Sequence, residues 1–169
     1  NELTESYDKA IADLAAKLEG VEPARVYLGG NSAFLSTAGP AMFQDLLIRG
    51  AGAENVASEI TDTYWATVSY EQLLAWNPDA IILAPQAEYT VDDVLNDPAL
   101  ADLDAVKNGK VYAMPNVIES WDSPIPSSYL GSIWMASVLY PDAVSTEDYT
   151  KACVDFYQQF YGFDASSVL

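Results

Sequence analysis

The sequence predicts an α/β fold, a three-layer sandwich in which helices cover both faces of a small, mostly parallel sheet of about four strands. Three observations support this fold class. Helical patterns alternate with short apolar runs along the chain. The run AIILA at residues 80–84 is continuously apolar, as is typical of a strand buried on both faces. Half of the 169 residues (50%) are hydrophobic, which is enough for a sizeable core.

The first expected element is a long helix over residues 1–20. Its apolar residues recur at spacings of three and four, which places them on one face of a helix. These residues are Leu3, Tyr7, Ile11, Leu14 and Leu18. Gly20 supplies the left-handed stop. Because this apolar stripe is narrow, we expect the helix to pack against another part of the protein along its length.

We expect residues 21–169 to form one α/β lobe without an internal linker. Its strands are predicted at residues 24–30, around 56, 80–84 and 110–115. Its helices are predicted at residues 41–50, 69–77, 90–109 (two short helices broken at Pro98), 128–140 and 146–162, the last capped by Thr146. Residues 31–40 and 116–127 are predicted to be loops, and residues 61–68 a loop or an edge strand.

The stretch VSYEQLLAWNPDAIILAP, residues 68–85, contains one helix followed by one strand. Ser69 and Gln72 have the spacing of a capping box, which sets the start of the helix. The helix ends before Pro78, because the residue that precedes a proline avoids helical angles. Glu71 stands in the first turn of this apolar segment and needs an explanation.

The charge of the chain narrows the partners that it could bind. Asp and Glu total 25 against 7 Lys and Arg, so the formal net charge is −18. Such a surface repels phosphate backbones and anionic membranes, and nucleic acid is therefore not an expected partner. No apolar run reaches the length of about 18 residues that a membrane-spanning helix needs. Since the chain begins directly with a helix and shows no signal peptide, we expect an upstream part to precede it.

The sequence lacks the residues that several common catalytic and metal-binding sites require. There is no histidine, so neither a Ser-His-Asp nor a Cys-His arrangement is available. The single cysteine, Cys153, lies in a helical pattern and is predicted to be a buried, unreactive thiol. No zinc-ligand set, phosphate-binding loop or dinucleotide fingerprint occurs. The sequence therefore predicts no catalytic residue, no metal ligand and no cofactor.

Four stretches in order resemble the substrate-binding proteins of ABC importers for iron chelates, haem and cobalamin. The first two are LLIRGAGAENVAS and VSYEQLLAWNPDAIILAP, the family's glycine turn and its V-S-x-E helix with the following strand. The third is LADLDAVKNGKVYAMP, and the last comprises the closing segments WDSPIPSSYLGSIWMASVLYPD and FYQQFYGFD. Each motif alone is weak, but their order is fairly specific, and together they cover nearly all of the chain after residue 20.

The resemblance implies a two-lobed receptor that holds its ligand in the cleft between the lobes. Residues 1–20 would be the rigid connecting helix and residues 21–169 the C-terminal lobe, with the N-terminal lobe absent from this chain. The parent would be extracytoplasmic, either periplasmic or a lipoprotein, and we expect a monomer. In the family a glutamate at the position of Glu71 pairs with arginines of the ABC permease. The alternative is local, because an acidic side chain in the first helical turn is favoured by the helix dipole.

Ligands of open parallel sheets lie beyond the carboxyl ends of the strands. Those ends are expected at residues 29–40, 58–67, 85–90 and 115–126. The candidate ligand-binding residues on these loops are Asn31, Ser32, Phe34, Tyr64, Trp65, Gln86, Tyr89, Trp121 and Asp122. The aromatic residues could instead cover the rim of the local core, and Asp122 could cap a turn before Pro124.

None of these loops carries a lysine or an arginine. An anionic ligand would favour charge-assisted donors in its cleft. The loops therefore disfavour molybdate, catecholate siderophores and haem propionates unless the other lobe supplies cations, and favour a neutral or cationic chelate such as a hydroxamate siderophore or a corrinoid. Two other readings remain open, a small-molecule enzyme on a related α/β fold and a free-standing interaction domain.

Overall fold

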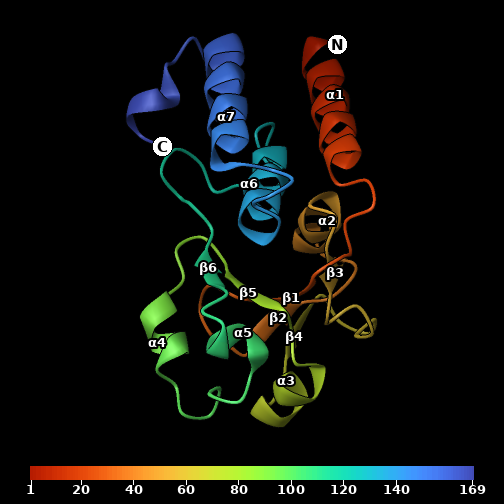
Figure 1. Ribbon diagram of the computed structural model, residues 1–169, viewed down its shortest axis with the longest axis vertical. Helices are drawn as coiled ribbons and strands as arrows, with labels where there is room; N and C mark the ends of the chain where they lie inside the picture. The colour runs from red at the N-terminus through yellow and green to blue at the C-terminus, as the bar shows by residue number, and fades with distance from the viewer.

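The computed structural model describes all residues, 1–169, and has the predicted α/β architecture (Figure 1). The helices are α1 (Glu2–Lys17), α2 (Phe43–Gly50), α3 (Tyr70–Trp76), α4 (Val91–Leu95), α5 (Asp104–Lys107), α6 (Tyr129–Leu139), α7 (Thr146–Tyr161) and the 3-10 helix η1 (Ala165–Ser167). The strands are β1 (Arg25–Gly29), β2 (Ser36–Ala38), β3 (Glu54–Asn55), β4 (Trp65–Thr67), β5 (Ala80–Leu83) and β6 (Val111–Ala113). No helix combines the length and the hydropathy that a membrane span requires.

The main sheet is entirely parallel, as predicted. Its strands follow the order β3-β1-β5-β6, and β1 is paired with β5 so that Tyr27 lies beside Ile81 and Leu28 beside Ile82. All four residues of β5 are buried, which confirms the prediction for the AIILA run. The carboxyl ends of these strands meet at one edge of the sheet, where the connecting loops emerge.

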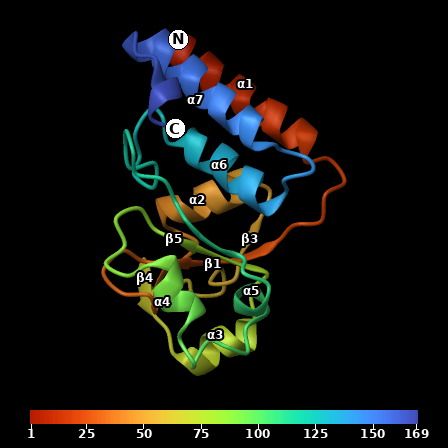
Figure 2. The same ribbon diagram turned by 60° about the vertical axis from the view of Figure 1, so that its left-hand side comes forward.

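Helices cover both faces of the sheet and complete the three layers. Helices α2, α6, α7 and α1 lie on one side, and α3, α4 and α5 lie on the other (Figures 1 and 2). Each side has its own hydrophobic cluster, of 23 buried residues on the α6 side and 14 on the α3 side. Alternate residues of β1 serve the two clusters, with Val26 and Leu28 on one side and Tyr27 on the other.

Helix α1 lies beside α6 and α7 at the outer surface of the larger cluster (Figure 2). The side chain of Asn1 caps it by accepting a hydrogen bond from the backbone N–H of Thr4. Leu14 is its only buried residue, while Leu3 and Ile11 are partly buried against the cluster. The predicted apolar stripe therefore faces the lobe, but much of the helix stays in contact with solvent.

Helix α3 and strand β5 follow the expected boundaries. The Ser69 hydroxyl accepts a hydrogen bond from the backbone N–H of Gln72, which is one half of the predicted capping box. Asn77 ends the helix in a left-handed conformation with a φ of 43°. Asparagine tolerates this conformation better than most residues, because its short polar side chain bonds locally.

Two local predictions were wrong. Residues 36–38, predicted as loop, form β2, which pairs antiparallel with β4 in a separate two-stranded sheet. The cap of α7 is Ser145 rather than Thr146, because the Ser145 hydroxyl accepts from the backbone N–H of Asp148 while the Asp148 carboxylate accepts from that of Ser145.

Cys153 lies on the buried side of α7, where it is fully shielded from solvent. Burial raises the pKa of its thiol to about 12, so the reactive thiolate is scarce at neutral pH. We expect a thiol-specific disulfide reagent at pH 8 to leave the folded protein unlabelled and to label it at once in denaturant. Rapid labelling of the folded protein would contradict the burial of this side chain.

Candidate ligand-binding edge of the sheet

Loops after β1 and β5 are joined to each other at the carboxyl edge of the main sheet. The Tyr89 hydroxyl donates to the carbonyl of Gly30 at 2.6 Å, and the backbone N–H of Glu88 donates to the carbonyl of Asn31 at 2.8 Å. These bonds hold the two loops as one unit, although 59 residues separate Gly30 from Tyr89 in the sequence.

Aromatic rings pack beneath these loops. Phe34 lies between Tyr27 and Tyr89, with ring centroids 5.5 Å and 5.7 Å away in edge-on arrangements. The Tyr27 hydroxyl donates to the Phe34 carbonyl at 2.7 Å, and burial raises the pKa of both tyrosines. A side chain at Gly29 would place its Cβ 2.6 Å from the Tyr89 hydroxyl, so this close approach requires glycine.

The two-stranded antiparallel sheet of β2 and β4 brings Trp65 to the same edge. The backbone N–H of Gly30 donates to the Ser36 carbonyl at 2.7 Å, which ties this small sheet to β1. A Cβ at Gly30 would lie 3.2 Å from the Trp65 ring, so the indole packs directly on the glycine backbone. Trp65 stays 37% exposed and Tyr64 is 67% exposed, which leaves aromatic surface free for a ligand.

Gln86 follows β5 with a φ of 60°, in the left-handed region that non-glycine residues rarely adopt. Its side chain is exposed, as is that of Asn31. A left-handed non-glycine residue costs about 1–2 kcal/mol, and such strain is often found at functional sites. The edge therefore combines exposed amides from Asn31 and Gln86 with exposed aromatic side chains from Tyr64 and Trp65.

Trp121 and Asp122 occupy different environments from the other candidates. Trp121 is only 2% exposed, and its indole N–H donates to the Tyr157 hydroxyl of α7 at 3.0 Å. This placement matches the alternative in which the ring covers local core. Asp122 is partly buried, and its carbonyl accepts from the Gln44 amide of α2 at 3.0 Å. Burial raises the pKa of the Asp122 carboxyl.

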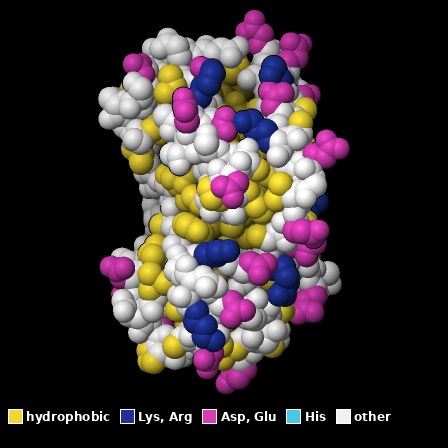
Figure 3. Space-filling view, viewed as in Figure 1, with side chains coloured by type: hydrophobic (Ala, Val, Ile, Leu, Met, Phe, Trp, Pro, Cys, Tyr) yellow, Lys and Arg dark blue, Asp and Glu magenta, His cyan; other side chains and the backbone are white.

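The electrostatic character of the edge is neutral to acidic. No lysine or arginine lies on the loops at this edge, whereas Glu88 is exposed among them. Figure 3 shows the general excess of acidic side chains on one face of the molecule. No cluster of three or more His, Cys, Asp or Glu side chains is placed to hold a metal ion. The side chains at the edge can therefore offer hydrogen bonds and aromatic contact to a ligand, but no cationic charge.

Glu71 stands in the first turn of α3 and is exposed. Hydrogen bonds from its own backbone N–H and from the Ser69 side chain lower the pKa of its carboxyl. These bonds favour the ionised form, as the local explanation for the residue requires. They leave the carboxylate on the surface, where a partner can reach it.

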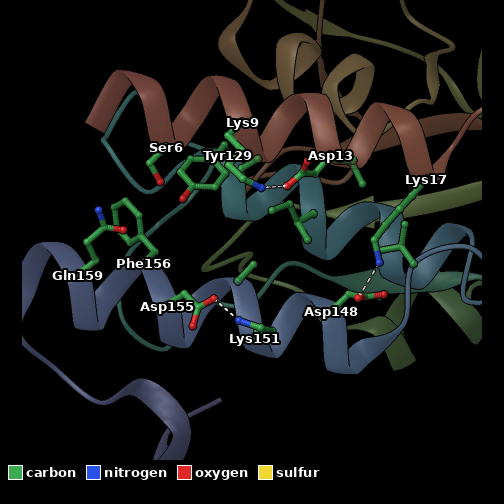
Figure 4. Close-up of a pocket in the computed structure, with 15 residues that line it drawn as sticks. Ser6, Lys9, Asp13, Lys17, Tyr129, Asp148, Lys151, Asp155, Phe156 and Gln159 are labelled. Atoms are coloured by element: carbon green, nitrogen blue, oxygen red, sulfur yellow. Dashed lines mark hydrogen bonds and ion pairs between the residues drawn. The ribbon is translucent and has the colours of Figure 1, made fainter. Parts of the chain in front are cut away.

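A groove away from the carboxyl edge lies between α1 and α7, over α6 (Figure 4). Its volume is about 430 Å³, its floor includes Leu14 and Phe156, and its rim carries lysine–aspartate pairs. Lys17 spans it to reach Asp148 at 2.7 Å, which lowers the pKa of that carboxyl to about 2. The rim of this groove is neutralised by its own ion pairs, whereas aromatic and amide groups from separate loops lie at the carboxyl edge.

Glu119 and Gln44 make hydrogen bonds that hold the loop after β6, the loop that carries Trp121 and Asp122. The sequence did not identify these two side chains as having that role. The Glu119 carboxylate accepts hydrogen bonds from Ser127 and Tyr157, and Gln44 holds the carbonyl of Asp122. Both side chains act across long sequence separations, 38 residues for Glu119 with Tyr157 and 78 for Gln44 with Asp122. No local pattern predicts such contacts.

Comparisons with known proteins agree with this architecture. The profile of the periplasmic binding protein family matches residues 1–118. The molybdate-binding protein MolA of Haemophilus influenzae is 34% identical over 154 residues, which are 90% of this chain and 43% of MolA. Its structure with bound molybdate has a TM-score of 0.81 at 33% identity, over 96% of this chain and 50% of the MolA chain.

Two further structures share the fold. A periplasmic solute binding protein from Veillonella parvula has a TM-score of 0.80 at 27% identity, over 96% of this chain and 51% of its own. A nickel–histidine complex of Helicobacter pylori CeuE has a TM-score of 0.86 at 22% identity, over 98% of this chain and 53% of its own. The chain thus spans about half the length of the relatives it matches. From the profile match and the shared fold we conclude that this chain belongs to the periplasmic binding protein family.

Proposed function

We propose that this chain is the C-terminal lobe, with its connecting helix, of the extracytoplasmic substrate-binding component of an ABC importer. The observation that carries the proposal is the convergence, at the carboxyl edge of the sheet, of the loops that carry Asn31, Gln86 and Tyr89 with Trp65 of β4. A second lobe facing this edge would close a cleft around a small molecule. The component binds and delivers its ligand without chemical change, and its parent is a monomer.

We propose a metal-containing small molecule as the ligand. The similarity to MolA favours molybdate, whereas the lack of lysine and arginine at the edge favours a neutral or cationic chelate. The two arguments are compatible with an oxyanion if neutral donors bind it, since backbone N–H groups and side-chain amides form anion sites without a full positive charge. Molybdate is therefore the first ligand to test, followed by a ferric hydroxamate and a corrinoid.

Calorimetric titration of the two-lobe receptor with molybdate tests the ligand and the edge together. We expect Trp65→Ala and Tyr64→Ala each to weaken binding by about tenfold, since an exposed aromatic anchor contributes about 1–2 kcal/mol. Phe163→Ala is the matched control, because Phe163 is also exposed (42%) but lies on the C-terminal tail. Unchanged affinity in both edge variants would reject the edge, and binding of a chelate in place of molybdate would identify the other ligand class.

Docking to the permease through Glu71 is the second part of the proposal. Its support is the exposed, ionised carboxylate at the start of α3 and the V-S-x-E pattern around it. Helix α3, which carries Glu71, lies in the layer opposite α6 (Figure 1). A permease could contact Glu71 there while the edge of the sheet holds the ligand.

A further inference from the structure

The long loop between β6 and α6 is held to the rest of the lobe by side chains alone. From residue 115 to residue 127 its backbone hydrogen bonds to other backbone groups all stay within the loop or join it to the first turn of α6. Pro115, Pro124 and Pro126 have no N–H to offer. The position of this segment therefore depends on side-chain contacts to α2, α6 and α7.

Among the side chains of this loop, Glu119 accepts more than one hydrogen bond. Its Oε2 accepts from the Ser127 hydroxyl at 2.5 Å and from the Tyr157 hydroxyl at 2.9 Å. The same Tyr157 hydroxyl accepts from the indole N–H of Trp121 at 3.0 Å. The chain Trp121–Tyr157–Glu119–Ser127 thus starts in the loop, passes through α7 and returns to the loop. Every donor to the carboxylate is neutral, so no ion pair competes for Glu119.

The segment held in this way begins at the carboxyl end of β6. Asn116 is exposed there, and Val117 is 61% exposed. Asp122, farther along the loop, reaches α2 through the amide of Gln44. The exposed residues Asn116 and Val117 belong to the same short segment as Glu119 and Trp121, which are hydrogen-bonded to α7. A shift of Glu119 would therefore also move Asn116 and Val117.

We propose that Glu119 is a positioning residue that fixes this loop against α7 and thereby sets the rim of the ligand cleft at Asn116 and Val117. The role of the rim rests on the proposed function, whereas the fixing of the loop does not. Glu119 acts through Tyr157 and Ser127 and does not itself touch the ligand.

Exchange of indole N–H protons in two-dimensional NMR spectra of the chain tests the anchor without any ligand. We expect Glu119→Ala and Tyr157→Phe to speed exchange of the Trp121 indole proton by about tenfold or more, because a charge-assisted network is lost. The Trp76 indole, which donates to Glu59 at 2.8 Å on the other side of the sheet, is the internal reference. Its rate should not change, whereas a general loss of stability would speed both.

Two further variants sharpen the test. Glu119→Gln retains an acceptor oxygen and should bring the Trp121 rate back to within about threefold of the parent. Tyr140→Phe is the matched control for Tyr157→Phe, because the Tyr140 hydroxyl also makes two hydrogen bonds, to Gly52 and Ala24, near the opposite end of the strands. It should leave the Trp121 rate unchanged. An unchanged rate in Glu119→Ala, or an equal effect of Tyr140→Phe, would overturn the proposal.

Molybdate titration of the two-lobe receptor then tests the rim. We expect Glu119→Ala to weaken binding by about tenfold and Glu119→Gln by less than about threefold. Faster exchange of the Trp121 indole proton in Glu119→Ala without any change in molybdate affinity would overturn the assignment of Asn116 and Val117 to the rim of the cleft. A parent receptor that binds no molybdate would count against that ligand, and the indole exchange rates would still decide the role of Glu119.

Discussion

Replacing Trp121 by alanine is expected to lower the free energy of unfolding by about 3–5 kcal/mol, which is the usual cost of removing a buried tryptophan side chain. The ring is 2% exposed, packs edge-on against Tyr149 with centroids 6.0 Å apart, and donates to Tyr157. Gly131 of α6 also lies against it, because a Cβ at that glycine would be 3.1 Å from the Cβ of Trp121. For a chain of this size the loss corresponds to a fall in Tm of roughly 6–20 °C.

Chemical denaturation of the parent and the variant measures this difference directly. Trp65→Ala is the control, because Trp65 is 37% exposed and its removal should cost no more than about 1 kcal/mol. The comparison thereby distinguishes a tryptophan in the core, Trp121, from one at the candidate ligand edge, Trp65. Equal stability losses in the two variants would mean that Trp121 is not the core residue described above.

Reversing the charge of Glu71 is expected to reduce import by at least about tenfold in cells that express the two-lobe receptor and its permease. In the proposed docking, where Glu71 pairs with arginines of the permease, a lysine would lose that ion pair and face like charges, which cost several kcal/mol across an interface. Folding should be little affected, since Glu71 is exposed and contacts only the first turn of its own helix. Uptake of radiolabelled or isotopically marked substrate is the measurement.

Glu147→Lys provides the matched control. Glu147 stands two residues after the serine cap of α7, as Glu71 stands two residues after the serine cap of α3, and both side chains are exposed. Both variants change the charge of a first helical turn by the same amount. Equal uptake in the two variants, with ligand binding intact, would reduce Glu71 to a local stabiliser of its helix.

The fold was predictable because its signals are local. The buried strand β5, the serine cap of α3 and the stop at Asn77 each depend on neighbouring residues, and the structure has them at the expected positions. Strand β2 was missed because its three residues, Ser36–Ala38, form no apolar run, and its partner β4, whose segment is predicted to be a loop or an edge strand, follows only after α2 and β3. The cap of α7 was misplaced by one residue because serine and threonine stand side by side there and both favour that position.

The candidate site was predictable only in part. The rule for the carboxyl ends of parallel strands brought Phe34, Tyr89 and Trp65 to one edge, where the structure places them in contact with the loop glycines or with each other. The same rule did not distinguish Trp121, whose burial depends on α7 some 36 residues later. A loop sequence shows which side chains are available, but whether a ring faces solvent or core is decided by distant elements.

The division of the lobe into two hydrophobic clusters has a consequence for folding fidelity. In the central pair of strands, Leu28 and Ile82 serve one cluster, while Tyr27 and Ile81 serve the other. A slip of β1 by a single residue would exchange these faces and move the Tyr27 phenol into the cluster on the α6 side, away from the Phe34 carbonyl to which its hydroxyl donates. A register shift would therefore lose packing in both hydrophobic clusters at once, which strongly favours the native register of β1.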